Sequence, residues 1–156
     1  MRLVFWAGFW TFLLDQASKY VVVYMLDLRT VGELDVLPPI LNLRMAWNTG
    51  INFGLLANDA ESARWLLIAV ALLVISVVIW WVYREPPGRM GLVSAGLLIG
   101  GALGNVVDRF LYGAVADFLN MSCCGIENPY AFNVADITIF AGAIGLILWG
   151  GNKKHA

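Results

Sequence analysis

The chain contains 156 residues, of which 60% are hydrophobic and 13% are charged. About 25% of the residues in a soluble domain are charged, so this composition excludes an ordinary soluble protein and predicts a single membrane-embedded domain over residues 1–156. The formal net charge is -1 and no long basic tract is present, which excludes nucleic acid as a partner.

The first apolar segment, residues 3–26, is long enough to cross a bilayer, which takes about 20 residues. Asp15 and Lys19 interrupt it four positions apart, so both lie on one face of a helix. A charged residue inside a membrane helix costs at least about 2.5 kcal/mol, and we therefore expect the pair to support a functional site. The alternative is a lysine that reaches the membrane surface beside a local partner. No small-residue cleavage site follows, so we predict an uncleaved helix.

Residues 27–64 are mixed and polar, with prolines, glycines and short alternating apolar runs. This pattern predicts an extracytoplasmic segment with a few short strands that form a small sheet. Its WNTGINFG stretch, residues 47–54, carries Asn48 and Gly50. Asparagine amides can bind an extended peptide and glycines allow close backbone approach, but a turn between strands explains the stretch equally well.

Residues 65–83 form the second candidate span, which has no charged residue and ends in an interfacial belt of Trp80, Trp81 and Tyr83. We interpret this span as scaffold. The six-residue connection that follows, residues 84–89, is short enough to require an antiparallel neighbour.

The third candidate span covers residues 90–109. Glycines recur at every fourth position, which predicts close approach of another helix; they are Gly96, Gly100 and Gly104. The end of this span is polar, and the groups there are Asn105, Asp108 and Arg109. Asp108 is a candidate catalytic acid, and it is equally a candidate ion-pair partner for Arg109 or for the face that carries Asp15 and Lys19.

Residues 110–134 are predicted to form a second extracytoplasmic segment, a loop that contains Asp117. A fourth apolar segment, residues 135–151, is slightly short for a span, so Asn133 and Asp136 should lie near its outer end. The adjacent Cys123 and Cys124 fit neither a disulfide framework nor a metal site, and we assign them no role.

Orientation follows from the basic residues beside the spans, which fall on one side; they are Arg2, Arg84, Arg89, Lys153 and Lys154. Both termini are therefore predicted to be cytoplasmic. The expected fold is a membrane all-α four-transmembrane-helix bundle with an extracytoplasmic β-rich segment between the first two helices. The polar ends of the first, third and fourth spans would then meet at the outer side of the membrane.

This set of acids favours hydrolysis. The chain has one histidine, His155, which is close to the C-terminus, so a serine or cysteine triad is not expected, and no residue spacing indicates a metal site. Two close carboxyls share a proton, so that one activates a water and the other polarises a carbonyl. The residues alone leave the pair open among Asp108, Asp117 and Asp136. They also leave open a proton-coupled transporter or channel that uses the same acids.

Five stretches of the chain resemble the lipoprotein signal peptidases, the signal peptidase II family of intramembrane aspartic proteases. They are DQASK at 15–19, NTGINFG at 48–54, GGALGNVVDR at 100–109, VADF at 115–118 and FNVAD at 132–136. The resemblance implies an endopeptidase of the bacterial inner membrane, active near the periplasmic face. It would remove signal peptides from prolipoproteins by cutting before a cysteine that carries diacylglycerol.

The same resemblance implies that Asp117 and Asp136 are the catalytic pair and that no cofactor is needed. It implies membrane lipids, lipid-modified prolipoproteins and peptide-like inhibitors of the globomycin type as partners. Other residues of the motifs would shape the site or orient substrate; they are Asp15, Lys19, Asn48, Gly50, Asn105, Asp108, Arg109 and Asn133. One departure is the second motif, which reads GINFG where many family members have GAAF.

Overall fold

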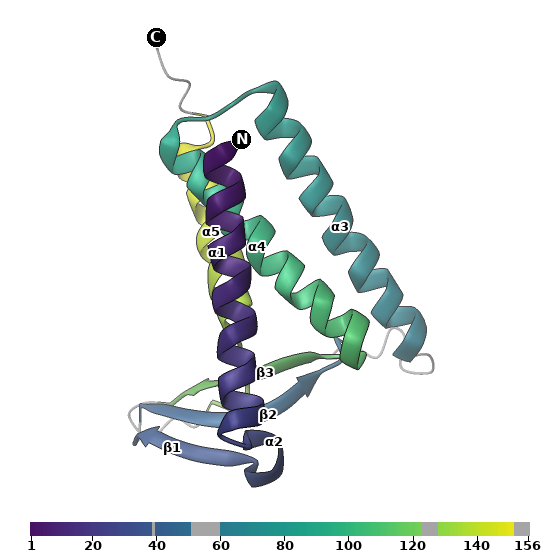
Figure 1. Cartoon of the computed structure of the whole chain (residues 1–156), viewed down its shortest axis with the longest axis vertical. Helices are drawn as coiled ribbons and strands as arrows, with labels where there is room; N and C mark the ends of the chain where they lie inside the picture. Colours follow the sequence, from purple (N-terminus) through teal and green to yellow (C-terminus); the bar gives the residue numbers. More distant parts are fainter. Residues whose placement is uncertain (39, 51–59, 123–127, 152–156) are drawn as a thin grey trace.

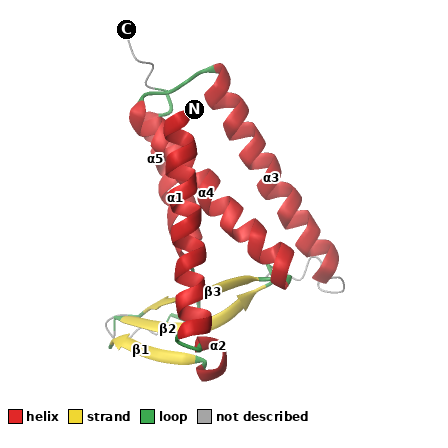
Figure 2. Ribbon diagram, in the orientation of Figure 1, coloured by secondary structure: helices red, strands yellow, loops and turns green. Residues whose placement is uncertain are grey.

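A computed structural model describes residues 1–38, 40–50, 60–122 and 128–151 of the protein (Figure 1). Long helices pack along one another, and a small sheet lies across one end of them (Figure 2). Residues 51–54 of the GINFG departure, the two adjacent cysteines and the C-terminal lysines and histidine lie outside the described residues.

The first helix, α1 (Arg2–Lys19), continues directly into a wider π-helical segment, η1 (Tyr20–Met25). The buried residues of α1 recur every three or four positions and form one face; they are Val4, Gly8, Thr11, Asp15 and Lys19. Large apolar side chains such as Trp6 and Trp10 are exposed on the other faces. In a water-soluble protein such a surface would be unfavourable, whereas in a bilayer it meets lipid.

The sheet contains three antiparallel strands in the order β1-β2-β3. A short helix, α2 (Leu28–Val31), leads into β1 (Glu33–Leu37) and β2 (Leu41–Asn48), which confirms the small β element predicted after the first helix. The third strand, β3 (Val115–Met121), comes from the segment that we predicted to be a loop. Five of the seven β3 residues are buried, so the strand has no polar and apolar alternation by which its sequence could have revealed it.

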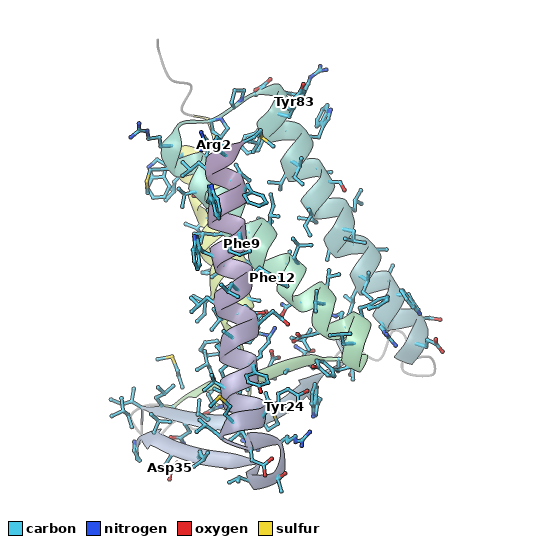
Figure 3. All side chains as sticks on the ribbon, in the orientation of Figure 1. Arg2, Phe9, Phe12, Tyr24, Asp35 and Tyr83 are labelled. Carbon is cyan, nitrogen blue, oxygen red and sulfur yellow. The ribbon has the colours of Figure 1, made fainter. Side chains whose placement is uncertain are left out.

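Two of the remaining helices, α3 (Ala60–Arg84) and α4 (Arg89–Tyr112), contain stretches long and apolar enough to cross a membrane. The last helix, α5 (Val134–Trp149), is also apolar but shorter. Helix α4 packs against α1, α3 and α5. Arg2 and Tyr83 lie at one end of the molecule, and Tyr24 and Asp35 lie at the sheet end (Figure 3).

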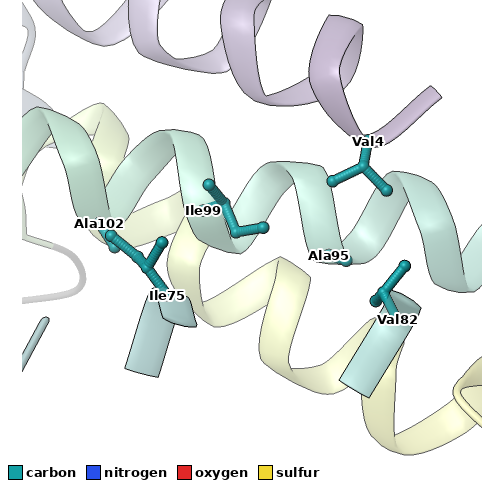
Figure 4. Packing of buried hydrophobic residues seen from close by; sticks show 6 residues of the cluster. All are labelled: Val4, Ile75, Val82, Ala95, Ile99 and Ala102. Atoms are coloured by element: carbon teal, nitrogen blue, oxygen red, sulfur yellow. The ribbon is translucent and has the colours of Figure 1, made fainter. Parts of the chain in front are cut away.

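Small residues bring α1 and α4 into close contact. A Cβ atom added to Gly100 would lie 2.8 Å from the Thr11 Cβ and 3.0 Å from the Gly8 carbonyl carbon, which confirms close packing as the reason for the glycine repeat. Apolar side chains of α1, α3 and α4 complete this contact; they are Val4, Ile75, Val82, Ala95, Ile99 and Ala102 (Figure 4).

Candidate functional site

Polar side chains are buried together where the sheet meets α1, α4 and α5. Most of them are 8% exposed or less; they include Asp15, Lys19, Asn105, Asp108, Asp117 and Asn133. A buried polar group is stable when it is hydrogen-bonded, and a buried charge when it is paired. Each of these side chains has such partners, and the partners join the groups into one network.

Asn133 contacts both Asp117 and Asp136. It is the residue before α5, where its side chain accepts a hydrogen bond from the Asp136 backbone N (2.9 Å) and its backbone N donates to Asp136 Oδ2 (3.2 Å). This reciprocal capping box satisfies the first turn of the helix. The free amide of the same side chain donates to Asp117 Oδ1 at 2.6 Å. The helix start therefore places both carboxyls in contact with the same residue.

Asp117 is held from its other side by β2. The side-chain amide of Asn48 donates to Asp117 Oδ2 at 3.0 Å, and the Gly50 backbone N donates to Asn48 Oδ1 at 2.9 Å. Gly50 has a φ of 77°, a left-handed conformation that favours glycine. The turn after β2 thus orients the Asn48 amide toward the carboxylate.

The pKa of Asp117, which lies on β3 outside the helices, is raised from its usual 3.8 to about 6. Burial of the carboxyl is the main cause, and the nearby negative charge of Asp136 adds to it. Hydrogen bonds from Asn48 and Asn133 act in the opposite direction. An acid with a pKa close to neutral is suited to giving and taking a proton during a reaction.

Asn105 connects this pair of acids to α1. Its amide donates to Asp136 Oδ1 at 3.0 Å, while its Oδ1 accepts from Asn133 and from Lys19 Nζ, each at 3.3 Å. One turn later on α4, Arg109 donates to the Asn105 carbonyl at 3.4 Å. The Arg109 Nε is buried and has no hydrogen-bond partner among the described residues. It is therefore a donor that an added group could use.

Lys19 forms two buried ion pairs. Its Nζ lies 2.8 Å from Asp15 Oδ2 and 2.8 Å from Asp108 Oδ2. The pairing of Asp15 with Lys19 confirms the prediction from their spacing. Between the two alternatives for Asp108, the structure selects the face of α1 over the neighbouring Arg109.

Gln16 is a member of the network to which the sequence analysis assigned no role. Its amide donates to Asp15 Oδ2 and to Asp108 Oδ1, each at 3.1 Å. Its position inside the DQASK motif was an available signal. An amide gives no indication of charge pairing, however, and its contact with Asp108 joins residues 92 positions apart.

Two cavities lie near these elements. One, of about 490 Å³, is apolar and lies among α1, α3 and α4 near the N-terminus, away from the acids. The other, of about 180 Å³, borders Lys19 and Asp108 and is also lined by Trp47 and Tyr112. Neither Asp117 nor Asp136 lines either cavity. The site around these acids is therefore defined by its hydrogen bonds and not by a cavity. The described residues contain no cluster suited to a metal ion.

All ten residues singled out in the sequence are thus brought into one region. The larger group, which touches Asp117 or Asp136 directly or through one residue, consists of Asn48, Gly50, Asn105, Arg109 and Asn133. The ion-paired group consists of Asp15, Lys19 and Asp108. Such an arrangement can hold two carboxyls close together with hydrogen-bond donors around them.

Comparison with known proteins identifies relatives over almost the whole chain. The family model described as signal peptidase (SPase) II matches residues 8–150. The lipoprotein signal peptidase of Methylobacterium sp. (strain 4-46) is 41% identical over 138 residues, which cover 88% of this chain and 82% of that protein. The lipoprotein signal peptidase of Rhodopseudomonas palustris (strain ATCC BAA-98 / CGA009) is 37% identical over 150 residues, which cover 94% and 90%.

Solved structures agree in fold. A bacterial membrane enzyme determined by the in meso method at 2.3 Å resolution has a TM-score of 0.76 and 25% identity, and the match covers 95% of this chain and 87% of that one. A second such structure, at 1.9 Å resolution, has a TM-score of 0.81 at 24% identity and covers 95% and 92%. On the family match and the identity with these relatives, the chain belongs to the signal peptidase II family.

Proposed function

We propose that this protein is an aspartic endopeptidase of the bacterial inner membrane that removes signal peptides from diacylglyceryl-modified prolipoproteins. It cuts immediately before the lipidated cysteine, and Asp117 and Asp136 are its catalytic residues. Membership of the signal peptidase II family supports peptidase activity over the transporter or channel that the residues alone left open.

One observation carries the choice of the two acids. Asn133 donates to Asp117 through its side chain and to Asp136 through its backbone, at 2.6 Å and 3.2 Å. Asp108, the third candidate, is instead ion-paired with Lys19 at 2.8 Å. Its oxygens also accept from the Gln16 amide and the Ala116 backbone N, so they are already used by donors of α1 and β3.

The raised pKa of Asp117 suggests how the two acids divide the reaction. Asp136 takes a proton from a water whose oxygen attacks the scissile carbonyl carbon, while protonated Asp117 gives its proton to the carbonyl oxygen. The C–N bond of the tetrahedral intermediate then breaks as Asp136 protonates the leaving amine. Asp117 recovers a proton from the new carboxyl group, which restores the starting state without a metal or cofactor.

Arg109 is the residue that we assign to substrate binding. The Arg109 Nε has no partner among the described residues, and Arg109 contacts Asn105, which in turn contacts Asp136. A guanidinium in this position can donate to the carbonyl groups of an extended peptide. A peptide-like inhibitor of the globomycin type should compete for the same donors.

We further propose four membrane spans, formed by α1 with η1, by α3, by α4 and by α5. Both termini would be cytoplasmic and the sheet periplasmic, because basic residues near helix ends concentrate on the cytoplasmic side. At 16 residues, α5 rises about 24 Å, less than the roughly 30 Å of hydrocarbon. The acids at its outer end would therefore lie close to the interface, where a diacylglyceryl cysteine is anchored.

The test is cleavage of a diacylglyceryl-modified precursor by purified enzyme in lipid nanodiscs. Asp117→Asn and Asp136→Asn should each reduce the rate at least about 100-fold, because each removes a group that exchanges protons in the reaction. Asp35→Asn, on the exposed face of β1, is the matched control and should cleave normally.

Normal cleavage by either dyad variant would refute the assignment of that aspartate. If instead the unaltered protein conducts protons or solutes in liposomes and releases no peptide, the peptidase proposal itself is wrong. Product analysis by mass spectrometry also checks the position of the cut, since the product must begin with the lipidated cysteine.

A further inference from the structure

The residue before each of the two acids is held in the same way. The backbone N of Ala116, before Asp117, donates to Asp108 Oδ2 at 3.2 Å. The backbone N of Ala135, before Asp136, donates to Asp15 Oδ1 at 2.9 Å. Two carboxylates on two different helices therefore fix the main chain at the two points from which the catalytic side chains project.

Lys19 joins these two carboxylates. Its Nζ is 2.8 Å from an oxygen of each, and all three side chains are 6% exposed or less. Gln16 adds a second bridge between the same pair of acids. A continuous path of short contacts thus runs from the Ala116 N–H through Asp108, Lys19 and Asp15 to the Ala135 N–H.

Close helix packing keeps this path short. Gly104 of α4 faces Asp15, and a Cβ atom added there would overlap the Asp15 carboxylate and approach its Cγ to 3.1 Å. The distance between α1 and α4 at this level therefore determines how far apart the two held main-chain groups are.

Stability does not account for such a network. Three buried charges are expensive to desolvate, and replacing buried ion pairs by apolar residues of similar volume is often neutral or stabilising. Asp15 and Gln16 have no hydrogen bond to the side chain of Asp117 or Asp136 among the described contacts. Their effect on the reaction must then pass through the main chain, or through Lys19, whose Nζ contacts Asn105 Oδ1 at 3.3 Å.

We propose that Asp15, Lys19 and Asp108 form a brace that sets the spacing of the Asp117 and Asp136 carboxyls. The brace residues are positioning residues, and this inference rests on the proposed peptidase function. The two carboxyls must together hydrogen-bond one water and one carbonyl group. A misplacement of reacting groups by about 1 Å can lower a rate about 100-fold. The brace holds the pair at a spacing that their own flexible side chains do not impose.

The decisive variant is the neutral brace Asp15→Asn/Lys19→Met/Asp108→Asn, which keeps an acceptor oxygen for each backbone N–H and removes the link between them together with the Lys19 contact to Asn105. It should melt at or above the temperature of the unaltered enzyme, since no charge is left buried there. Its kcat for the diacylglyceryl precursor should fall about 100-fold while KM is unchanged, because substrate binding is retained and the reacting geometry is lost. Asp27→Asn, in the exposed Asp27 and Arg29 pair, is the matched control and should change neither.

A second readout uses a precursor peptide whose scissile amide is replaced by a secondary alcohol. Both carboxyls must contact this alcohol, so the neutral brace should lose affinity for it in parallel with the loss of kcat. The single variants Asp15→Ala and Asp108→Ala should each be slow, and their combination little slower than either, because both break the same link.

A neutral brace that is folded and has the kcat of the unaltered enzyme would overturn the proposal, as would additive effects of the two single variants. A neutral brace that does not fold would assign the network to stability and would also overturn it. These results are distinguishable from failure of the peptidase proposal, in which Asp117→Asn and Asp136→Asn themselves would cleave normally.

Discussion

Asp117 combines a titratable group with almost complete burial, since it is 2% exposed. Its raised pKa means that the folded protein binds a proton there more tightly than the unfolded chain does. Between the usual pKa of 3.8 and the folded value of about 6, folding therefore takes up a proton. The contribution of Asp117 to the free energy of unfolding decreases as pH rises through this window and is constant above it.

Asp117→Asn should remove this decrease, because asparagine resembles the protonated acid and does not titrate. A raised pKa of this size corresponds to about 3 kcal/mol, at about 1.4 kcal/mol per pKa unit. Relative to the unaltered protein, the variant should therefore gain up to about 3 kcal/mol between about pH 4 and about pH 8. Thermal unfolding in detergent at the two pH values measures the gain. An equal difference at both values would contradict the assigned pKa.

At the scale of the elements, the contact between α1 and α4 is the one that positions the polar network. Four glycines in this contact have little room for a side chain, and the room differs from one to the next; they are Gly8, Gly96, Gly100 and Gly104. A Cβ atom on Gly100 would overlap the Gly8 carbonyl oxygen, whereas one on Gly8 would lie 3.3 Å from its nearest neighbour, the Gly96 carbonyl oxygen. In both cases the nearest atom is a main-chain oxygen, which cannot move aside as a side chain does. The shorter distance at Gly100 should therefore make alanine more costly there than at Gly8.

Gly100→Ala should destabilise the protein by about 1–3 kcal/mol, the usual cost of inserting atoms into a well-packed contact. Gly8→Ala should be close to neutral, because its milder crowding is offset by the roughly 1 kcal/mol that alanine gains over glycine in a helix. Melting temperatures of the two variants in the same detergent measure the difference. Equal effects would show that α1 and α4 can separate without cost.

For the molecule as a whole, the acids lie at the sheet end of the helices and the connection between α3 and α4 lies at the other end (Figure 1). A lipid-anchored substrate can reach the acids when the sheet end faces the periplasm. The proposed orientation therefore predicts that exposed residues at the sheet end are accessible from the periplasm and that exposed residues at the other end are accessible from the cytoplasm.

Single cysteines provide the measurement, in a background where Cys123 and Cys124 are replaced by serine. Glu33→Cys, exposed on β1, should react with a membrane-impermeant maleimide on cells with a permeabilised outer membrane. Glu85→Cys, exposed between α3 and α4, should react only after the inner membrane is disrupted. Labelling in the reverse order would show that the topology is inverted, with the acids on the cytoplasmic side and out of reach of the lipid-anchored substrate.

Several features of the site were readable in the sequence because each has a local cause. The Asp15 and Lys19 pair follows from a spacing of four residues on one helix, and the glycine repeat of α4 follows from the same period. The choice of Asp117 and Asp136 over Asp108 came from the resemblance of the motifs to a family, since residue chemistry alone left all three open.

The sequence by itself determined that this is a membrane protein with apolar helices, a small sheet and a cluster of acids too costly to be accidental, because hydropathy and spacing are local properties. Only the tertiary structure decided that Lys19 pairs with Asp108, that Asn133 contacts both remaining acids, and that the segment with Asp117 is a strand paired to β2. These contacts join residues that are distant in the chain, and their partners depend on how closely the helices pack. No local pattern encodes that distance.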